Sequence, residues 1–188
     1  MPELYNVDNY KKFLKIALEA RRNSELDEDG FSYLHPISVA AELIATFPFI
    51  NISQEEADKA IACALLHSAA ENTNYPYEHM GFDKDIVDGV KALMRDNSIP
   101  TTRLQTKDCL IRISKLPRYV QMVMLAERIS LLDFPPPTKS KEDILFCQNE
   151  SREILERLRL SNKLLAQKLS DKINSYSKYI NYYPPLIS

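Results

Sequence analysis

Three side chains that are able to bind a metal ion lie in apolar, helix-like surroundings. His35 begins the segment HPISVAAELI, His67 follows AIACALL, and Glu127 follows VMLA. A titratable side chain among residues that should be buried needs a partner, because burying it alone is costly. Two histidines and one carboxylate brought together from three segments would form a metal site with positions left open for water. The other interpretation is a pair of hydrogen-bonded core histidines, with Glu127 paired to an arginine such as Arg118 or Arg128.

The elements that carry these residues are predicted to be helices. Apolar residues recur at spacings of three and four along most of the chain, whereas no alternation with a period of two persists. The sequence has only 3 glycines, which argues against folds rich in tight β-hairpin turns. The sequence therefore predicts an all-α protein with helices at 7–22, 35–47, 53–70, 82–96, 107–116 and 117–134, and a last long helix from about 141 to about 180 that need not be continuous.

Two of these helices carry further signals. Ser53 and Glu56 stand in an S-x-x-E pattern, which predicts a capping box at the start of the third helix. The sixth helix is apolar on most sides, so we expect it to lie at the centre of the fold. We expect one domain over residues 1–188, with a core at about 7–134 and a C-terminal helical extension at about 138–188.

Composition argues against several classes of protein. The formal net charge is -2, so the basic footprint of a nucleic-acid-binding protein is missing. No run of about 18 apolar residues predicts a membrane span, and the first residues lack the apolar core of a signal peptide. The three cysteines, Cys63, Cys109 and Cys147, are far apart and odd in number. They predict free thiols in a reducing compartment, and thus a cytoplasmic protein.

Four segments of the chain resemble a known family in their order and separation. These segments are YLHPISVAAELI, ALLHSAAENT, FDKDIVDGVKAL and VMLAERI. They look like the four signature blocks of the HD-domain hydrolases. The most similar subgroup is the RelA/SpoT-type guanosine tetraphosphate (alarmone) hydrolases and their small stand-alone relatives. The resemblance spans about residues 17–134 and implies an HD-domain helical bundle.

The resemblance also implies a metal centre, usually manganese, held by two histidines and two aspartates. Such a metal activates a water molecule and polarises the phosphate under attack. His35 and His67 match the two histidines, whereas Ser68 stands where one aspartate belongs. Glu127 stands at the other aspartate position and is longer by one methylene. The implied cofactor is Mn²⁺ or another divalent metal, held by His35, His67 and Glu127.

The residues that would assist the metal and hold the substrate have changed as well. Glu71 matches the first acid of the catalytic Glu-Asp pair that the resemblance implies, and Asn72 replaces the second. Leu26 stands at the position of an arginine that packs on the guanine in the family. Arg21 and Arg22, several residues earlier, are the candidates for substrate binding. Acidic residues between 25 and 29 would repel a ligand with two pyrophosphate groups.

Three hypotheses follow from these residues. The first is a degenerate HD-domain protein, or pseudoenzyme, in which (p)ppGpp pyrophosphohydrolase activity is lost or greatly weakened. It would act as a nucleotide-binding or regulatory module for a nucleotide, another small phosphate ligand or a protein partner. The second is an active metal-dependent phosphohydrolase on a nucleotide, with Glu71 as the base. The third is a helical scaffold in which apolar residues such as Met124 and Leu131 fill the former cleft.

Overall fold

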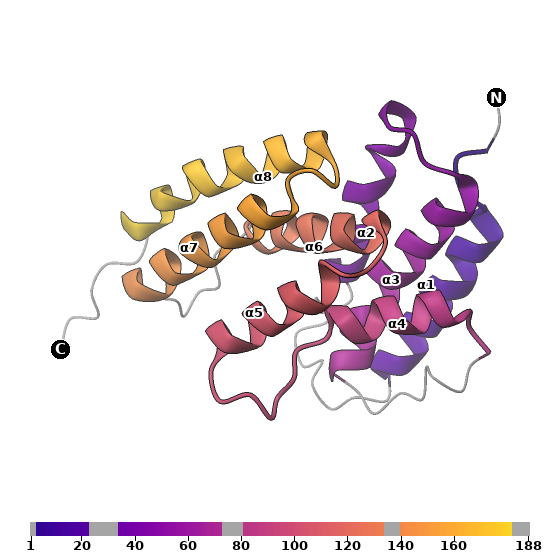
Figure 1. Ribbon diagram of the computed structural model, residues 1–188, viewed down its shortest axis with the longest axis horizontal. Coiled ribbons are helices and arrows are strands. Elements are labelled where there is room, and N and C mark those ends of the chain that lie inside the picture. Colours follow the sequence, from indigo (N-terminus) through magenta and orange to yellow (C-terminus); the bar gives the residue numbers. More distant parts are fainter. Residues whose placement is uncertain (1–2, 23–33, 73–80, 134–139, 182–188) are drawn as a thin grey trace.

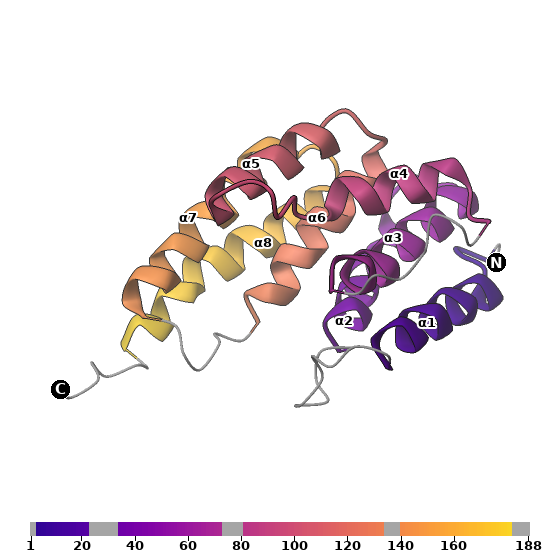
Figure 2. The same cartoon turned by 90° about the horizontal axis from the view of Figure 1, so that it is seen from below.

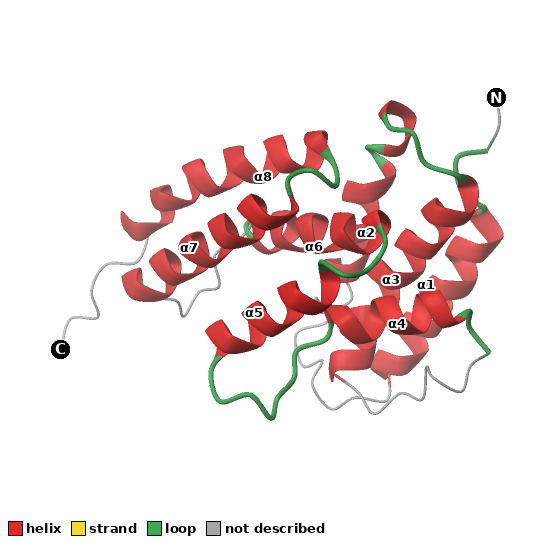
Figure 3. Ribbon diagram, in the orientation of Figure 1, coloured by secondary structure: helices red, strands yellow, loops and turns green. Residues whose placement is uncertain are grey.

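The computed structural model describes residues 3–22, 34–72, 81–133 and 140–181, without the side chains of residues 21, 22, 71, 72 and 181. Within these ranges the chain forms helices and no strand (Figures 1 and 3), which confirms the predicted all-α class. The helices are α1 (Val7–Arg22), α2 (Leu34–Ile44), α3 (Gln54–Asn72), α4 (Lys84–Leu93), α5 (Thr102–Ile113), α6 (Arg118–Leu131), α7 (Lys141–Leu158) and α8 (Lys163–Tyr176), with short 3-10 turns η1 (Phe47–Phe49) and η3 (Ser177–Asn181).

Local sequence signals set several of the helix ends. Helix α1 has the bounds that the spacing of its apolar residues predicts. The Ser53 N–H donates to Glu56 Oε2 at 3.1 Å, and the Glu56 N–H donates to Ser53 Oγ at 3.2 Å. These reciprocal bonds confirm the capping box before α3. They satisfy two backbone donors that a helix start would otherwise leave without partners.

The predicted fifth helix is displaced along the chain. It was expected at residues 107–116, whereas α5 begins at Thr102 and ends at Ile113. The early start has a local cause, because the Thr101 side chain accepts a hydrogen bond from the Leu104 N–H at 3.4 Å and caps the helix. Thr101 is therefore the N-cap and Thr102 the first residue of α5, since threonine is a favoured N-cap residue.

The last long helix is broken into α7 and α8. Helix α7 ends at Leu158, and α8 begins at Lys163. The break is stabilised by Asn162, whose side chain accepts hydrogen bonds from two backbone N–H groups in the first turn of α8, at 2.9 and 3.1 Å. The Asn162 Nδ2 also donates to Thr46 Oγ1 at 3.0 Å, which ties the start of α8 to the end of α2. The two helices lie side by side in Figures 1 and 2.

Helix α6 lies at the centre of the described structure, as its apolar character predicts. It packs against α2, α3, α7 and α8. The residues of α6 that have no exposed surface are Val120, Val123, Leu125, Ala126 and Ile129. The division into a core at 7–134 and an extension at 138–188 stays a prediction, but α7 and α8 also pack directly against α6. The Glu127 side chain therefore starts from a buried helix, which limits where it can point.

Helix α3 is the second central element, and every residue from 60 to 70 on it is buried. Four of its neighbours, α1, α2, α4 and α6, pack around it. Its many alanines allow this close approach. On the α4 side the approach requires Gly89, because a Cβ there would lie 2.6 Å from Cys63 Sγ and 3.2 Å from a methyl of Val120. A helix buried all round is apolar on all sides, so the polar residues His67 and Ser68 stand out on it.

Two further predictions concern the whole chain. All three cysteines are free and buried, as their number and separation predict. None of the described helices is both long and apolar enough to cross a membrane.

Candidate functional site

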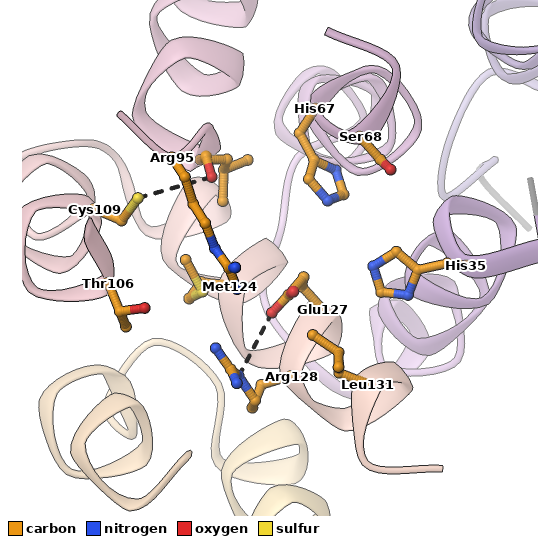
Figure 4. Close-up of a pocket in the computed structure, with 11 residues that line it drawn as sticks. His35, His67, Ser68, Arg95, Thr106, Cys109, Met124, Glu127, Arg128 and Leu131 are labelled. Carbon is orange, nitrogen blue, oxygen red and sulfur yellow. Dashed lines mark hydrogen bonds and ion pairs between the residues drawn. The ribbon is translucent and has the colours of Figure 1, made fainter. Parts of the chain in front are cut away.

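Helices α2, α3 and α6 bring the predicted metal ligands to one cavity. His35 lies in the first turn of α2, His67 near the end of α3, and Glu127 in the second half of α6. All three line a cavity of about 380 Å³, together with Ser68. Figure 4 shows the two imidazole rings and the Glu127 side chain around the same space. The sequence signals of three separate helices therefore meet at one place.

The hydrogen bonds of His67 determine which ring nitrogen faces the cavity. Its Nδ1 lies 2.9 Å from the Ala64 carbonyl oxygen and 3.2 Å from that of Cys63. Both partners are acceptors, so Nδ1 is a donor, and in the neutral ring the lone pair is on Nε2. A backbone carbonyl holding one nitrogen in this way orients a histidine whose other nitrogen binds a metal or accepts a hydrogen bond. The His35 ring lies 6.1 Å away, edge-on at 70°, with its Nδ1 3.1 Å from Ser130 Oγ.

Glu127 lies beside a buried arginine. Its Oε2 is 3.7 Å from Arg128 Nε, and neither atom makes a hydrogen bond within the described structure. Of the two arginines that the sequence offered as partners of Glu127, Arg128 is the one nearby. Arg118 instead donates to the backbone carbonyl of Ser161. The sequence interpretation of Glu127 as an ion-paired residue thus has a structural basis.

The main partner of Arg128 comes from α7, which the sequence did not indicate. Arg128 Nη1 donates to Glu150 Oε2 at 2.8 Å, and Thr106 Oγ1 donates to Glu150 Oε1 at 2.6 Å. Arg128, Glu150 and Thr106 are all buried. Burial lowers the pKa of Arg128, but the charges of Glu127 and Glu150 outweigh it and raise the pKa above its ordinary value. The guanidinium is therefore permanently charged, and its position is fixed by the α5–α7 side of the cavity.

Arg95 is a further cavity residue that the sequence analysis missed. It follows the end of α4 and reaches into the cavity toward Met124 and Glu127 (Figure 4). An arginine just after a helix usually interacts with the last carbonyls of that helix or with solvent, so its sequence position gave no signal. Met124 and Leu131, which the third hypothesis expects to fill the former cleft, form part of the apolar wall of the cavity. They leave the cavity open, so the described residues do not fill the cleft.

A divalent metal ion does not fit the described side chains well. No three His, Cys, Asp or Glu residues in the described ranges are grouped so that they could hold a metal ion. Ser68 offers a neutral hydroxyl, which is a weaker ligand for a hard cation than a carboxylate. The one carboxylate on the wall, among the described residues, is Glu127, and it has a guanidinium beside it. The binding of Mn²⁺ or another metal by His35, His67 and Glu127 stays a prediction.

Several predicted site residues fall outside the described structure. Helix α3 extends to Asn72, so Glu71 and Asn72 lie in its last turn, but their side chains are not among those described. The same holds for Arg21 and Arg22 at the end of α1. Leu26 lies between the described ranges. The roles of these residues in catalysis and substrate binding stay predictions.

The fold is similar to that of a known hydrolase. No protein-family model matches the sequence, and no curated protein matches it at the level of sequence. A solved structure of a metazoan orthologue of SpoT that hydrolyses ppGpp superposes with a TM-score of 0.72 and 18% sequence identity. The match covers 88% of this chain and 94% of that one. The HD-domain helical fold that the four sequence blocks predict is therefore confirmed, and at this identity the likeness concerns the fold alone.

Proposed function

We propose that the protein is a degenerate HD-type domain that binds a nucleotide or another small phosphate-bearing ligand in the cavity between α2, α3 and α6. Its pyrophosphohydrolase activity, which would release pyrophosphate from such a nucleotide, is lost or greatly weakened. The observation that carries the proposal is Ser68, which faces the cavity beside His67 where the resemblance calls for an aspartate. A guanine nucleotide of the ppGpp type is the first candidate ligand, because the similar solved structure is that of a ppGpp hydrolase.

The chemistry of the site supports the loss of activity. Of the four positions that hold the metal in the resembled family, only Glu127 remains anionic, and Arg128 lies 3.7 Å from it. A cation there would compete with that guanidinium for the carboxylate. Asn72 has no titratable group with which to take up or release a proton, unlike the aspartate it replaces. A domain that keeps the cavity but lacks this chemistry is suited to sensing a ligand or regulating a protein partner.

A thermal-shift experiment with a nucleotide panel tests the proposal. A ligand at about one hundred times its Kd adds about 2.7 kcal/mol to the free energy of unfolding, which corresponds to roughly 5–10 °C for a chain of this size. Release of phosphate and of pyrophosphate from each nucleotide, measured in parallel, should stay at the level of the buffer. Leu131→Trp, which fills the cavity from its wall, should abolish the shift, whereas Leu104→Trp on the exposed side of α5 should retain it. If neither a nucleotide nor a simpler phosphate such as inorganic pyrophosphate raises the melting temperature, or if both variants respond alike, the proposal is wrong.

The alternative is an active metal-dependent phosphohydrolase with an altered site. It is favoured by the cavity-facing lone pair on His67 Nε2, next to His35 and Glu127. Elemental analysis should then find about one equivalent of manganese, iron or zinc, and EDTA should abolish phosphate release from a nucleotide. Restoring Ser68→Asp, Asn72→Asp and Glu127→Asp together should raise the affinity for Mn²⁺ on either hypothesis. Phosphate release by the unmodified protein is the measurement that separates the two.

A further inference from the structure

The two most exposed large apolar side chains among the described residues lie at one end of the protein. Leu160, in the turn between α7 and α8, is 83% exposed, and Phe49, the last residue of η1, is 75% exposed. The next in order, Leu104 on α5, is only 49% exposed. Leu164, in the first turn of α8, is exposed as well and follows Leu160 by four positions. We call Phe49, Leu160 and Leu164 the apolar cluster.

Hydrogen bonds bring together the segments that carry this cluster. Asn162 Nδ2 donates to Thr46 Oγ1 at 3.0 Å, so the turn before α8 lies against the end of α2 (Figure 1). Arg118, the first residue of α6, donates to the backbone carbonyls of Ser161 and Asn51. Segments that are 116 positions apart in the chain therefore form one surface.

The exposed side chains of the cluster stand on a buried base. Phe47 is buried and Pro48 follows it, so the turn that presents Phe49 is anchored in the core. Leu158 and Leu165 are buried on either side of the turn that presents Leu160 and Leu164. A surface whose backbone is held in place loses little conformational entropy when a partner binds.

The surroundings of the cluster are basic. The segments 46–53, 115–118 and 158–164 contain four Lys or Arg residues and no Asp or Glu. These four, which we call the cationic rim, are Lys115, Arg118, Arg159 and Lys163, and all are exposed. None of them forms an ion pair with another described residue. Glu156, just before the last segment, instead lines a groove between α5 and α7.

Acids next to these segments have partners of their own. Glu42, four positions before the first segment, pairs with Lys168 at 2.6 Å. Glu55 and Glu56 follow that segment in the first turn of α3. Lys59 binds Glu55 at 2.7 Å, and Glu56 accepts the backbone N–H at the start of the helix. The cationic rim therefore gives this end of the protein an excess of positive charge.

We infer that this surface binds a segment of a partner protein in which bulky apolar side chains are flanked by Asp or Glu residues. The apolar side chains pack on the apolar cluster, and the carboxylates meet the cationic rim. An exposed apolar patch with a charged border is typical of a protein interaction site, and opposite charges across the border speed association and set its orientation. The inference goes beyond the proposed function, because no residue of the cluster or the rim lines the cavity.

Charge distinguishes this partner from other occupants. A second copy of the chain, bound symmetrically through the same surface, would set the cationic rim against itself. Nucleic acid or an anionic membrane presents a broad negative surface, which the rest of this chain would repel, because its formal net charge is -2. A short acidic segment avoids this repulsion, since charges more than about 8 Å away are largely screened at physiological ionic strength.

Selection from a phage-displayed library of short random peptides tests the inference. The library is first depleted on the double variant Phe49→Ser/Leu160→Ser and then selected on the unmodified protein. Retained peptides should be enriched in Leu, Ile or Phe and in Asp or Glu. A synthetic copy, followed by fluorescence polarisation, should bind the double variant at least about tenfold more weakly. Arg159→Gln/Lys163→Gln should weaken its binding by at least about fivefold.

Matched controls remove the same kinds of side chain from another exposed surface. Leu104→Ser and Arg103→Gln on α5 should leave the affinity for the synthetic peptide unchanged. Far-UV circular dichroism establishes that each variant is folded, as expected for changes at exposed positions. Equal weakening by the controls and by the variants of the cluster and the rim would overturn the inference.

The remaining outcomes also decide the inference. A selection that retains no peptide, or retains peptides without enrichment in Asp or Glu, overturns it. Tighter binding of phosphatidylserine vesicles or of an oligonucleotide than of the selected peptides, weakened by the same variants, assigns the surface to another occupant and overturns it too. So does self-association in analytical ultracentrifugation that Phe49→Ser/Leu160→Ser abolishes. None of these results bears on ligand binding in the cavity, so the proposed function is tested separately.

Discussion

Among the polar contacts of the described residues, the buried pair of Arg128 and Glu150 should be the one whose disruption lowers the stability most. It joins the central helix α6 to α7, and the two side chains are only 3% and 6% exposed. The change that tests it is Glu150→Gln, which keeps the shape and a hydrogen-bonding oxygen but removes the negative charge. The amide oxygen of the variant could still accept a bond from Thr106 or from Arg128. The substitution therefore measures the charge of Glu150 with little loss of packing.

The expected cost follows from the geometry. The donor and acceptor atoms are 2.8 Å apart, which puts the charge centres about 4 Å apart and their attraction at about 4 kcal/mol for an effective dielectric constant near 20. In the variant, the charge of Arg128 is still partly compensated by Glu127, whose Oε2 lies 3.7 Å from Arg128 Nε. Breaking a buried pair from one side costs about 3–5 kcal/mol when nothing else compensates the charge. We therefore expect Glu150→Gln to lower the free energy of unfolding by about 2–4 kcal/mol.

Urea denaturation followed by circular dichroism at about 222 nm measures this loss, with an unchanged m-value as the sign that the comparison is valid. The control is Glu153→Gln on the next turn of α7. Glu153 pairs with Arg103 at 3.6 Å, and the two side chains are 44% and 64% exposed. Exposed pairs of this kind contribute less than about 1 kcal/mol. Equal losses for the two variants would show that burial does not set the strength of the Arg128 contact, and would refute the reasoning.

Three further predictions concern packing and capping. Gly89→Ala should lower the free energy of unfolding by about 1–3 kcal/mol, because the new Cβ lies 2.6 Å from Cys63 Sγ. Adding Cys63→Ala should relieve most of this loss. If the losses of the two single variants simply add in the double variant, the predicted clash is contradicted. Cys63 should resist iodoacetamide at about pH 8 until the protein is unfolded, because burial raises its pKa to about 12; rapid labelling of the native protein, measured by peptide mass spectrometry, would contradict this. Asn162→Ala should lower the free energy of unfolding, measured by urea denaturation, by about 2–4 kcal/mol, since the α8 cap and the bond to Thr46 are both lost. The control Ser140→Ala removes the exposed cap of α7 and should lower it by only about 1 kcal/mol.

Much of the fold follows from local sequence signals. The bounds of α1 and the capping box before α3 were predicted correctly, because a helix and its cap involve residues at most four positions apart. The four sequence blocks predicted the HD-domain fold, which the similarity to the solved hydrolase confirms. The break between α7 and α8 could not be located. Asn162 marks it partly through a bond to Thr46, 116 positions earlier in the chain.

By itself, the sequence determined that this protein is helical and that His35, His67, Ser68 and Glu127 are unusual residues on apolar helices. Those properties depend on side-chain type and on a period of about 3.6 residues, which can be read along the chain. Only the tertiary structure decided what surrounds them. Arg128 and Glu150 are 22 positions apart, and Thr106 and Glu150 are 44 apart. Such contacts form when helices pack, and no local pattern encodes them, so the guanidinium groups in the cavity became visible only in the folded chain.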